Sequence, residues 1–288
     1  MKVWIDGAIV PVEQARISVL DHGLLYGDGV FEGIRAYGRA VFRLDDHLAR
    51  LATSAKAIGL RLPQPVEAIR GIVLDTLRAF GRDDAYVRLV VTRGEGALGV
   101  DPTTCPAPRL FCIAAEAVIY PPAKLASGLD LVTVSVRRPA LDAVDPRVKS
   151  LNYLNNALAK QEARQRGADE ALILNAAGSV AEASVANVFA LHGRALMTPP
   201  PNDGSLDGIT RRSVRELAPG LGLANVERSL ARVDLLGADE VFLSGTGAGL
   251  VPVRSLDGQT IGAGEPGPVF AKLRAAFLEL TKTLGVPF

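Results

Sequence analysis

The chain has 288 residues, a length that suits one large domain or two medium ones with a proper hydrophobic core. It is 48% hydrophobic and 22% charged, and its formal net charge is +1. Acidic and basic residues are interspersed, which excludes the concentrated basic face that binding to nucleic acid or anionic lipid needs. The chain has two cysteines, no His/Cys ligand set for a metal, and no signal peptide or membrane-length apolar run. These features predict a cytoplasmic protein of enzyme size without a metal or a membrane partner.

The first third of the chain predicts short strands, tight turns and two helices. Asp6-Gly7 and Gly38-Arg39 separate short apolar stretches, which is typical of β-hairpins. Apolar residues recur at intervals of three and four between Asp45 and Gly59, and a second helix is expected from Pro65 to Phe80. The strands expected in this region are 4–5, 9–10, 30–37, 40–44, 85–92 and 110–115.

The run Pro121-Pro122-Ala123-Lys124 is stiff and lies between strands, so we predict a domain boundary there. The expected parts are a small N-terminal domain at 1–119, a linker at 120–127 and a large C-terminal domain at 128–288. Strands and helices mix without a strict β-α-β repeat, which favours two α/β lobes of the α+β type over a doubly wound sheet. Beyond the linker we expect strands at 131–136, 171–174, 188–191 and 240–243, and helices at 151–166, from 209 and at 268–284.

Lys149 is one of only seven lysines in the chain. A catalytic amine must come from lysine, because a guanidinium group stays protonated and cannot react with an aldehyde. The other six lysines lie near the terminus, after the paired prolines, or on expected helices with solvent-facing sides. Lys149 instead lies between an expected strand and a new helix, a kind of junction where active sites collect. Taken alone, it could also be an exposed lysine ahead of a helix.

Two further stretches carry groups that suit a cofactor. Glu182 lies between apolar strands, where a carboxylate is costly to bury unless a cation or a protonated ring nitrogen faces it. Asp207-Gly208-Ile209-Thr210-Arg211 has the form of a loop that enters a helix, and the free N–H groups of a helix start bind phosphate well. The alternatives, taken singly, are a turn residue and an ordinary helix cap.

A glycine-rich turn and an arginine complete the set. Residues 242–249 are not a dinucleotide fingerprint, since residues 250–253 cannot begin the required helix, but the turn could donate amides and a Thr hydroxyl to phosphate. Arg50 could point inward from its helix towards an anion, or could be a surface arginine. Pyridoxal phosphate needs such a combination: an amine for its aldehyde, a carboxylate for its ring nitrogen, and dipoles with positive charge for its phosphate.

The chain resembles the class IV (fold type IV) aminotransferases, and more closely the branched-chain amino acid aminotransferases. Seven stretches carry this resemblance in family order and extend over nearly the whole chain. They are Tyr26 to Arg35, His47 to Leu51, Tyr86 to Arg88, Lys149 to Asn156, Glu182 to Asn187, Gly208 to Arg211 and Ser244 to Thr246. The resemblance implies a small N-terminal and a larger C-terminal α/β lobe with pyridoxal 5'-phosphate between them.

The resemblance also implies a role for each matching residue. Lys149 would bind the cofactor covalently and then move a proton between substrate and cofactor. Tyr153 would hydrogen-bond the phenolic oxygen of the cofactor, and Glu182 would pair with its ring nitrogen. The residues implied for the phosphate are Arg50, Ile209, Thr210 and Thr246.

The residues implied for the substrate pocket are Tyr26, Phe31, Arg35, Tyr86, Arg88, Val100, Gly247 and Ala248. Tyr86 and Arg88 would help to receive substrate carboxylates, including the distal carboxylate of 2-oxoglutarate. In the family, the equivalents of Tyr26 and Val100 reach in from a partner subunit. The resemblance therefore implies a homodimer or a higher homo-oligomer with the site shared across the interface.

The implied activity is transamination of leucine, isoleucine and valine with 2-oxoglutarate, as in branched-chain amino acid biosynthesis. Two loops depart from the usual family pattern, because 182–187 reads Glu-Ala-Ser-Val-Ala-Asn and 247–249 reads Gly-Ala-Gly in place of Ala-Ala-Glu. The resemblance implies that both loops affect substrate specificity. A D-amino acid or (R)-amine transaminase, or an aminodeoxychorismate lyase, is the alternative within the fold, and Tyr153 with the stretch 30–35 favours the branched-chain interpretation. A catalytically idle scaffold is the other alternative, against which Lys149 and Glu182 argue.

Overall fold

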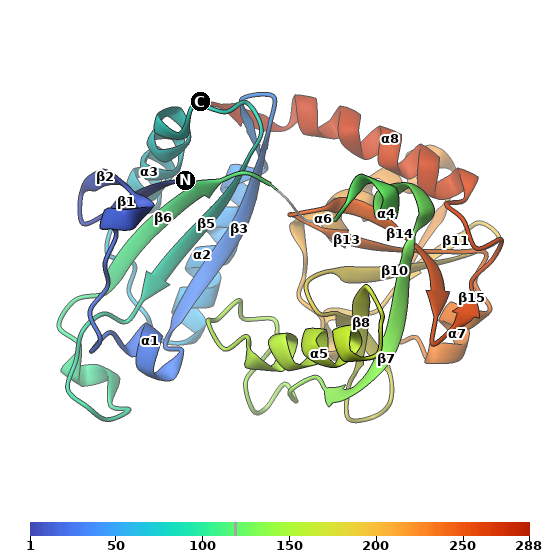
Figure 1. Ribbon diagram of the computed structural model, residues 1–288, viewed down its shortest axis with the longest axis horizontal. Coiled ribbons are helices and arrows are strands. Elements are labelled where there is room, and N and C mark those ends of the chain that lie inside the picture. The colour runs from blue at the N-terminus through green and yellow to red at the C-terminus, as the bar shows by residue number, and fades with distance from the viewer. Residues whose placement is uncertain (118–119) are drawn as a thin grey trace. The chain divides into compact units, whose positions relative to one another are not determined.

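The structure is a computed structural model that describes residues 1–117 and 120–288, and it divides the chain into two compact units. Unit 1 comprises Met1–Ala117, Val148–Asn152 and Thr281–Phe288, and unit 2 comprises Val118–Arg147 and Tyr153–Leu280. Each unit has its own sheet with helices packed on it (Figure 1). The expected mixture of helices and sheets in two lobes is therefore confirmed.

Unit 1 contains a seven-stranded sheet in the order β16-β4-β3-β5-β6-β1-β2, in which all neighbouring strands are antiparallel. Its strands are β1 (Lys2–Ile5), β2 (Ala8–Pro11), β3 (Gly29–Tyr37), β4 (Ala40–Phe42), β5 (Ala85–Thr92), β6 (Arg109–Ala115) and β16 (Gly285–Pro287). The hairpins predicted at Asp6-Gly7 and Gly38-Arg39 are both present. All four turn residues have positive φ, as tight hairpin turns of the mirror-image type require.

Three helices belong to unit 1: α1 (His22–Tyr26), α2 (Leu44–Ala57) and α3 (Val66–Phe80). Helices α2 and α3 cover one face of the sheet (Figure 1). The apolar stripes predicted from the sequence carry this packing, because Leu48 and Leu51 of α2 join Ile69 and Leu77 of α3 in one buried cluster with the sheet. The opposite face of β3 and β5 carries side chains that are not part of this apolar cluster.

Unit 2 contains a nine-stranded sheet. Eight strands follow the order β12-β11-β10-β13-β14-β7-β8-β9, and the remaining strand, β15, pairs with β14. The strands are β7 (Leu129–Arg137), β8 (Glu170–Leu174), β9 (Val180–Ala183), β10 (Asn187–His192), β11 (Ala195–Thr198), β12 (Ala224–Glu227), β13 (Glu240–Gly245), β14 (Gly249–Leu256) and β15 (Gln259–Thr260). Parallel and antiparallel pairs are mixed, which agrees with the expectation against a doubly wound sheet.

The helices that begin in unit 2 are α4 (Pro122–Ser127), α5 (Leu154–Gln165), α6 (Ile209–Leu217), α7 (Arg232–Leu236) and α8 (Pro268–Thr283). Helix α5 packs its Ala159 and Ala163 on Val134 and Ile173 of the sheet. Short 3-10 turns occur at Val12–Gln14, Pro102–Thr104, Pro201–Asp203 and Pro219–Leu221. In the part of the chain that the structure describes, no helix has both the length and the apolar character needed to cross a membrane.

Several elements differ from the sequence-based expectation. Helix α5 begins at Leu154 and not at Leu151, because Leu151 N–H donates to the carbonyl of Gly29 at 2.9 Å and is used in strand-like pairing. Residues 122–127, within the segment predicted as a linker, form the short helix α4. Segment 148–152 clusters with unit 1, and residues 118–119 lie outside the described residues, so the domain limits 1–119 and 128–288 stay a prediction.

A buried ionic cluster joins β3 to α2. Arg50 donates from Nε and Nη2 to the two oxygens of Glu32 at 2.8 Å each, and His47 Nδ1 lies 2.8 Å from Glu32 Oε2. Burial raises the pKa of Glu32, but the Arg50 charge and the hydrogen bonds from Arg50 and His47 outweigh it and lower the pKa from 4.5 to about 2. Burial also lowers the pKa of His47. The sheet and the helix are thus held together by an ionised carboxylate at neutral pH.

We predict that Glu32→Gln lowers the free energy of unfolding by about 3 kcal/mol at pH 7, because it leaves the Arg50 charge buried without its carboxylate. The stability that Glu32 contributes is fully present above its unfolded pKa near 4.5 and is lost as the pH falls towards the folded value of about 2. The difference between variant and wild type should therefore shrink as the pH falls from 5 to 3. Urea unfolding over pH 7 to 3 measures it.

The matched control is Glu67→Gln on α3, whose side chain is 84% exposed and pairs with Arg70 at 3.6 Å. An exposed pair of this kind contributes little, so this control should unfold like the wild type at every pH. A stability loss for Glu32→Gln that is the same at pH 7 and at pH 3 would contradict the explanation by charge.

Candidate active site

Lys149 lies on a short extended segment that pairs with β3 inside unit 1. Its carbonyl accepts a hydrogen bond from Phe31 N–H at 3.0 Å, and its own N–H donates to Ser54 Oγ at 3.2 Å on α2. Its amine Nζ lies 4.4 Å from the centre of the Phe31 ring, within the range of a cation–π interaction. The backbone on both sides and the amine itself are therefore held by β3 and α2. No pattern in the sequence indicated this role for Ser54.

Strands β3 and β5 bring four of the predicted substrate residues to one face of the unit 1 sheet. The register pairs Arg35 with Tyr86 and Gly33 with Arg88, and alternate side chains of a strand share a face. Phe31, Gly33 and Arg35 therefore lie on the same face as Tyr86 and Arg88. On it, Arg88 Nη2 donates to Tyr86 Oη at 3.0 Å, and the Arg88 guanidinium lies 4.5 Å from the centre of the Phe31 ring.

The predicted pocket residues Tyr26 and Val100 belong to a more exposed part of unit 1. Tyr26 ends α1, and its hydroxyl accepts a hydrogen bond from Gly99 N–H at 2.8 Å. Val100 follows directly and is 79% exposed. The two residues are thus linked through Gly99 and form one surface.

Arg50 points inward from α2, as the sequence suggested, and its side chain is only 9% exposed. Within unit 1 it forms the two-pronged ion pair with Glu32 described above. Sequence reasoning did not identify Glu32, although its signal was present. A charged residue between Phe31 and Gly33, in a strand whose alternate side chains are apolar, must find a cation on the core face.

Glu182 lies in unit 2, near the end of β9, and is buried. Its carboxylate accepts hydrogen bonds from Arg138 Nη2 at 2.6 Å, from Asn187 Nδ2 at 3.0 Å and from Leu206 N–H at 3.0 Å. A carboxylate buried between apolar strands needs a cation or a protonated ring nitrogen opposite it, and the structure supplies the cation Arg138. Arg138 itself was missed, because it directly follows Arg137 at the end of β7 and only the fold shows which of the two turns inward.

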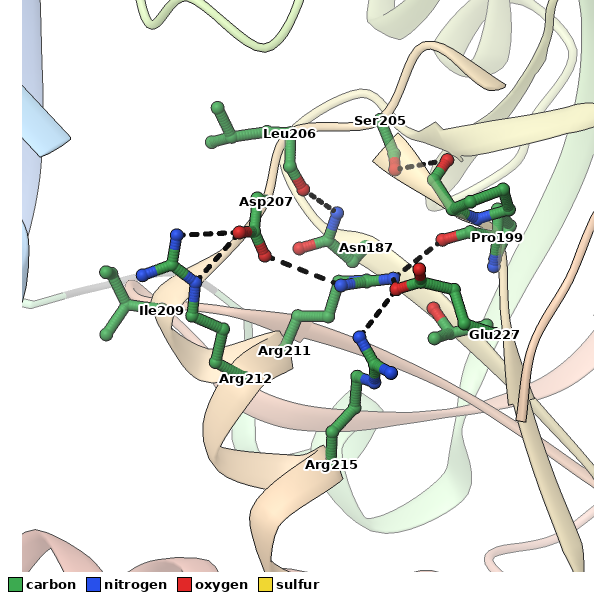
Figure 2. A network of polar contacts seen from close by, with 12 residues as sticks. Asn187, Pro199, Ser205, Leu206, Asp207, Ile209, Arg211, Arg212, Arg215 and Glu227 are labelled. Atoms are coloured by element: carbon green, nitrogen blue, oxygen red, sulfur yellow. Dashed lines mark hydrogen bonds and ion pairs between the residues drawn. The ribbon is translucent and has the colours of Figure 1, made fainter. Parts of the chain in front are cut away.

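The start of α6 is fixed by the polar network in Figure 2. Arg211 is 1% exposed and donates to Pro199 O at 2.9 Å and to Glu227 Oε2 at 2.6 Å, and it also pairs with Asp207 at 3.4 Å. Arg212 binds Asp207 from the other side at 2.6 Å. These bonds hold residues 207–212 against β12 and against Pro199, which follows β11, so the first turn of α6 has a defined position.

Helix α6 begins in the form that suits an anion. Gly208 precedes it and provides no side-chain cap, while Ile209 and Thr210 are buried at its first two positions. The first N–H groups of a helix have no partner within the helix and carry its positive dipole end. A Cβ at Gly208 would overlap the side-chain oxygen of Asn187. This close approach explains the glycine in physical terms.

Asn187 links the carboxylate to this helix start. Its Nδ2 donates both to Glu182 Oε2 at 3.0 Å and to Leu206 O at 2.7 Å. Glu182, Asn187 and the turn that leads to Gly208 are therefore joined by hydrogen bonds, and Figure 2 shows the bond from Asn187 to Leu206. Asn187 was noted as part of the acidic motif but not as a site residue.

The remaining predicted cofactor residues also lie in unit 2. Tyr153 directly precedes α5, and Thr246, Gly247 and Ala248 form the turn between β13 and β14. The register pairs Asn187 with Ser244, and a Cβ at Gly245 would lie 3.2 Å from the carbonyl oxygen of Val185. The two loops that depart from the family pattern, 182–187 and 247–249, are therefore neighbours in this unit.

The structure thus gathers the candidate residues in two groups. Unit 1 holds Lys149, Arg50 and the substrate residues of β3 and β5, and unit 2 holds Tyr153, Glu182, Ile209, Thr210 and the turn with Thr246. Each group combines a charged group with fixed hydrogen-bond donors. One can present an amine and an arginine to a substrate, and the other a carboxylate and an uncapped helix start to a cofactor.

Comparisons with known proteins agree on one family. The sequence pattern of amino-transferase class IV matches residues 29–256, which is more than half of the chain. Over 99% of its length the chain is 46% identical to a protein of Methanocaldococcus jannaschii that is provisionally named a branched-chain-amino-acid aminotransferase, and it covers 98% of that protein. These results confirm the resemblance inferred from the seven stretches.

Solved structures give the same result. The branched-chain amino acid aminotransferase of Escherichia coli superposes with a TM-score of 0.94 at 35% identity, over 97% of this chain and 94% of that one. The T.th. enzyme of the same name, solved with pyridoxamine 5'-phosphate, gives 0.93 at 38% identity, over 98% and 94%. It was also solved with N-(5'-phosphopyridoxyl)-L-glutamate and with 4-methylvaleric acid. None of these relatives favours the D-amino acid, amine or lyase alternative. The chain belongs to the class IV aminotransferase family.

Proposed function

We propose that this protein transfers an amino group between the branched-chain L-amino acids leucine, isoleucine and valine and 2-oxoglutarate. The observation that carries the proposal is the pair of cations at the Phe31 ring. The amine of Lys149 and the guanidinium of Arg88 lie 4.4 Å and 4.5 Å from the centre of this one apolar side chain. A group able to move protons and a group able to receive a carboxylate are thus held beside an apolar wall.

Pyridoxal 5'-phosphate is the proposed cofactor, and the donor set of the chain fits it. Lys149 offers an amine, Glu182 a buried carboxylate, and Ile209 and Thr210 an uncapped helix start. The T.th. relative solved with pyridoxamine 5'-phosphate supports this choice. When bound, the cofactor supplies an aldehyde that takes up the amino group and a ring that withdraws electrons from the substrate.

The proposed roles follow from the chemistry of each side chain. Lys149 binds the cofactor and moves a proton at the substrate Cα. Glu182 holds a proton at the ring nitrogen, while Arg138 and Asn187 fix the orientation of its carboxylate. Tyr153 donates to the phenolic oxygen. The residues proposed to hold the phosphate are the amides of Ile209 and Thr246, the hydroxyls of Thr210 and Thr246, and Arg50.

The substrate pocket has to accept an aliphatic chain and, in the other half-reaction, a second carboxylate. Phe31, Tyr26 and Val100 provide apolar surface, and Arg88 with Tyr86 provides the carboxylate site. Relatives solved with 4-methylvaleric acid and with a glutamate derivative support both kinds of substrate. The remaining members of the proposed pocket are Arg35, Gly247 and Ala248.

The proposed active form is a homodimer or a larger homo-oligomer in the cytoplasm, in which a partner subunit supplies Tyr26 and Val100. Large apolar side chains are exposed around these two residues, among them Val19 at 73%, Leu24 at 58% and Leu98 at 77%. Exposed apolar surface of this kind marks an interface between proteins.

The free thiols of Cys105 and Cys112 suit a reducing compartment, which supports the proposed cytoplasmic location.

The first prediction for this function concerns Lys149. The protein with its cofactor should show a visible absorption band that borohydride removes, and the reduced cofactor should remain on the peptide that contains residue 149. Lys149→Ala should keep the fold but lose transamination by about 1,000-fold or more, because both the covalent link and the proton transfer are lost. Lys56→Ala, exposed on α2, is the control with normal activity. A cofactor adduct on Lys124 or Lys160 would overturn the assignment.

The second prediction concerns the charge of Glu182. Glu182→Gln should cause a large fall in kcat with little loss of bound cofactor, because a neutral amide no longer keeps the ring nitrogen protonated. The variant also leaves the Arg138 charge buried without its partner, so its stability should fall as well. Glu170→Gln removes another buried carboxylate, one held by Lys160 at 2.7 Å, and should lower stability while kcat stays near normal. A near-normal kcat for Glu182→Gln would reject its role.

The third prediction separates the two half-reactions. Arg88→Ala should weaken 2-oxoglutarate and glutamate by about 10- to 100-fold, since a hydrogen bond to a charged group contributes about 1.5–3 kcal/mol. Leucine should be affected far less, because its side chain needs no cation. Single-turnover measurements of each half-reaction test this. Equal losses for leucine and glutamate would mean that Arg88 supports the pocket as a whole or binds the carboxylate that all substrates share.

A further inference from the structure

Gly33 lies at the centre of the β3–β5 face that carries the proposed substrate residues. It stands directly opposite Arg88 in the strand register and between Phe31 and Arg35 along β3. Its φ is not among the positive values of the chain, so its backbone conformation is one that any residue can adopt. Glycine weakens the interior of a strand and often marks a place where another group approaches closely. The reason for this glycine must therefore be space.

The group that uses this space is the side chain of Tyr86. A Cβ at Gly33 would overlap the Tyr86 hydroxyl oxygen and lie 3.0 Å from its Cζ, and the three nearest atoms all belong to Tyr86. The Tyr86 ring therefore lies across β3 where a side chain at 33 would stand. In this position Tyr86 Oη accepts a hydrogen bond from Arg88 Nη2 at 3.0 Å.

This contact holds Arg88 without neutralising it. In the described parts of the chain, 1–117 and 120–288, no carboxylate pairs with Arg88, and its buried Nε has no hydrogen-bond partner. Its contacts are with two uncharged rings, the Phe31 ring at 4.5 Å and the Tyr86 ring at 5.7 Å, and with the Tyr86 hydroxyl. The guanidinium is thus oriented in advance and keeps its charge for an anion, an arrangement that favours binding by reducing the ordering cost.

We propose that Gly33 is a positioning residue that sets the selectivity for dicarboxylate substrates. By leaving space for Tyr86, it lets the phenol hold Arg88 ready for the distal carboxylate of 2-oxoglutarate or glutamate. A side chain at position 33 displaces the Tyr86 hydroxyl and releases Arg88. The proposal rests on the transamination proposed above, and it assigns a role to a residue that has no side chain and acts through Tyr86 and Arg88.

A double-mutant cycle with Gly33→Ala and Tyr86→Phe tests the proposal. Each single variant should raise the KM for 2-oxoglutarate by about 10-fold, the loss of roughly one charge-assisted hydrogen bond, with a much smaller rise in the KM for leucine. In Gly33→Ala, kcat should stay within about twofold of wild type. The double variant should be no worse than the poorer single variant, because the hydroxyl that the new methyl group displaces is already absent. Losses that multiply to about 100-fold would overturn the proposal, and so would equal losses for both substrates.

Two controls distinguish the possible failures. Gly71→Ala on α3 adds a Cβ that would meet nothing within 4 Å, and it should behave like the wild type in all assays. If Gly33→Ala does not fold, Tyr86→Phe alone still decides, since an unchanged KM for 2-oxoglutarate in that variant would reject the role of the hydroxyl. A wild-type protein that transaminates neither leucine nor glutamate would overturn the proposed function together with this inference. An active wild type with an additive cycle would overturn this inference alone.

Discussion

Two backbone hydrogen bonds tie the segment around Lys149 to β3: Phe31 N–H to Lys149 O at 3.0 Å, and Leu151 N–H to Gly29 O at 2.9 Å. They determine which unit carries the amine, although the chain on both sides of the segment belongs to the other unit. Backbone bonds of this kind do not depend on side-chain rotamers. The catalytic candidate therefore takes its position from a strand edge, with the amine directed at the Phe31 ring.

The same strand serves two purposes because its side chains alternate. Phe31, Gly33 and Arg35 face the proposed substrate, while Glu32 faces the core and pairs with Arg50 of α2. The ion pair fixes the helix that also supplies Ser54 to the Lys149 backbone. A shift of β3 by one residue would exchange these two faces and would place the carboxylate in the pocket. The register of β3 is therefore a functional constraint as well as a structural one.

Each unit buries one carboxylate against an arginine, Glu32 with Arg50 and Glu182 with Arg138. Such pairs are seldom the most stable choice, since removing two charges from water costs several kcal/mol and well-packed apolar residues avoid that cost. A buried pair instead fixes the orientation of its carboxylate. Glu182 has Arg138, Asn187 and Leu206 as donors, and they define the orientation of its carboxylate far more narrowly than apolar packing would.

The sequence predicted most of the fold where periodicity was strong. Helices α2 and α3 and the strands β1 to β6 of unit 1 were expected close to their observed limits. The elements β11, β12, β16 and α7 were not expected, because they are too short to show a repeat. The motif residues of the family were found, but their partners were not. The fold brings Arg138 and Ser54 to the candidate residues from distant parts of the sequence, so no local residue spacing predicts them. Gly33 was visible inside a quoted stretch, yet its meaning depends on Tyr86, which lies on another strand.

The altered turn at 247–249 follows from the same physical reasoning. Gly249 is buried and has φ of 69°, a conformation that side chains rarely adopt, so the glutamate usual at this position in the family would be strained here and would need a buried partner. Gly245 packs against Val185 and Ala186 of the other altered loop, whose residues are also small. The two departures are therefore one change in a single packed surface.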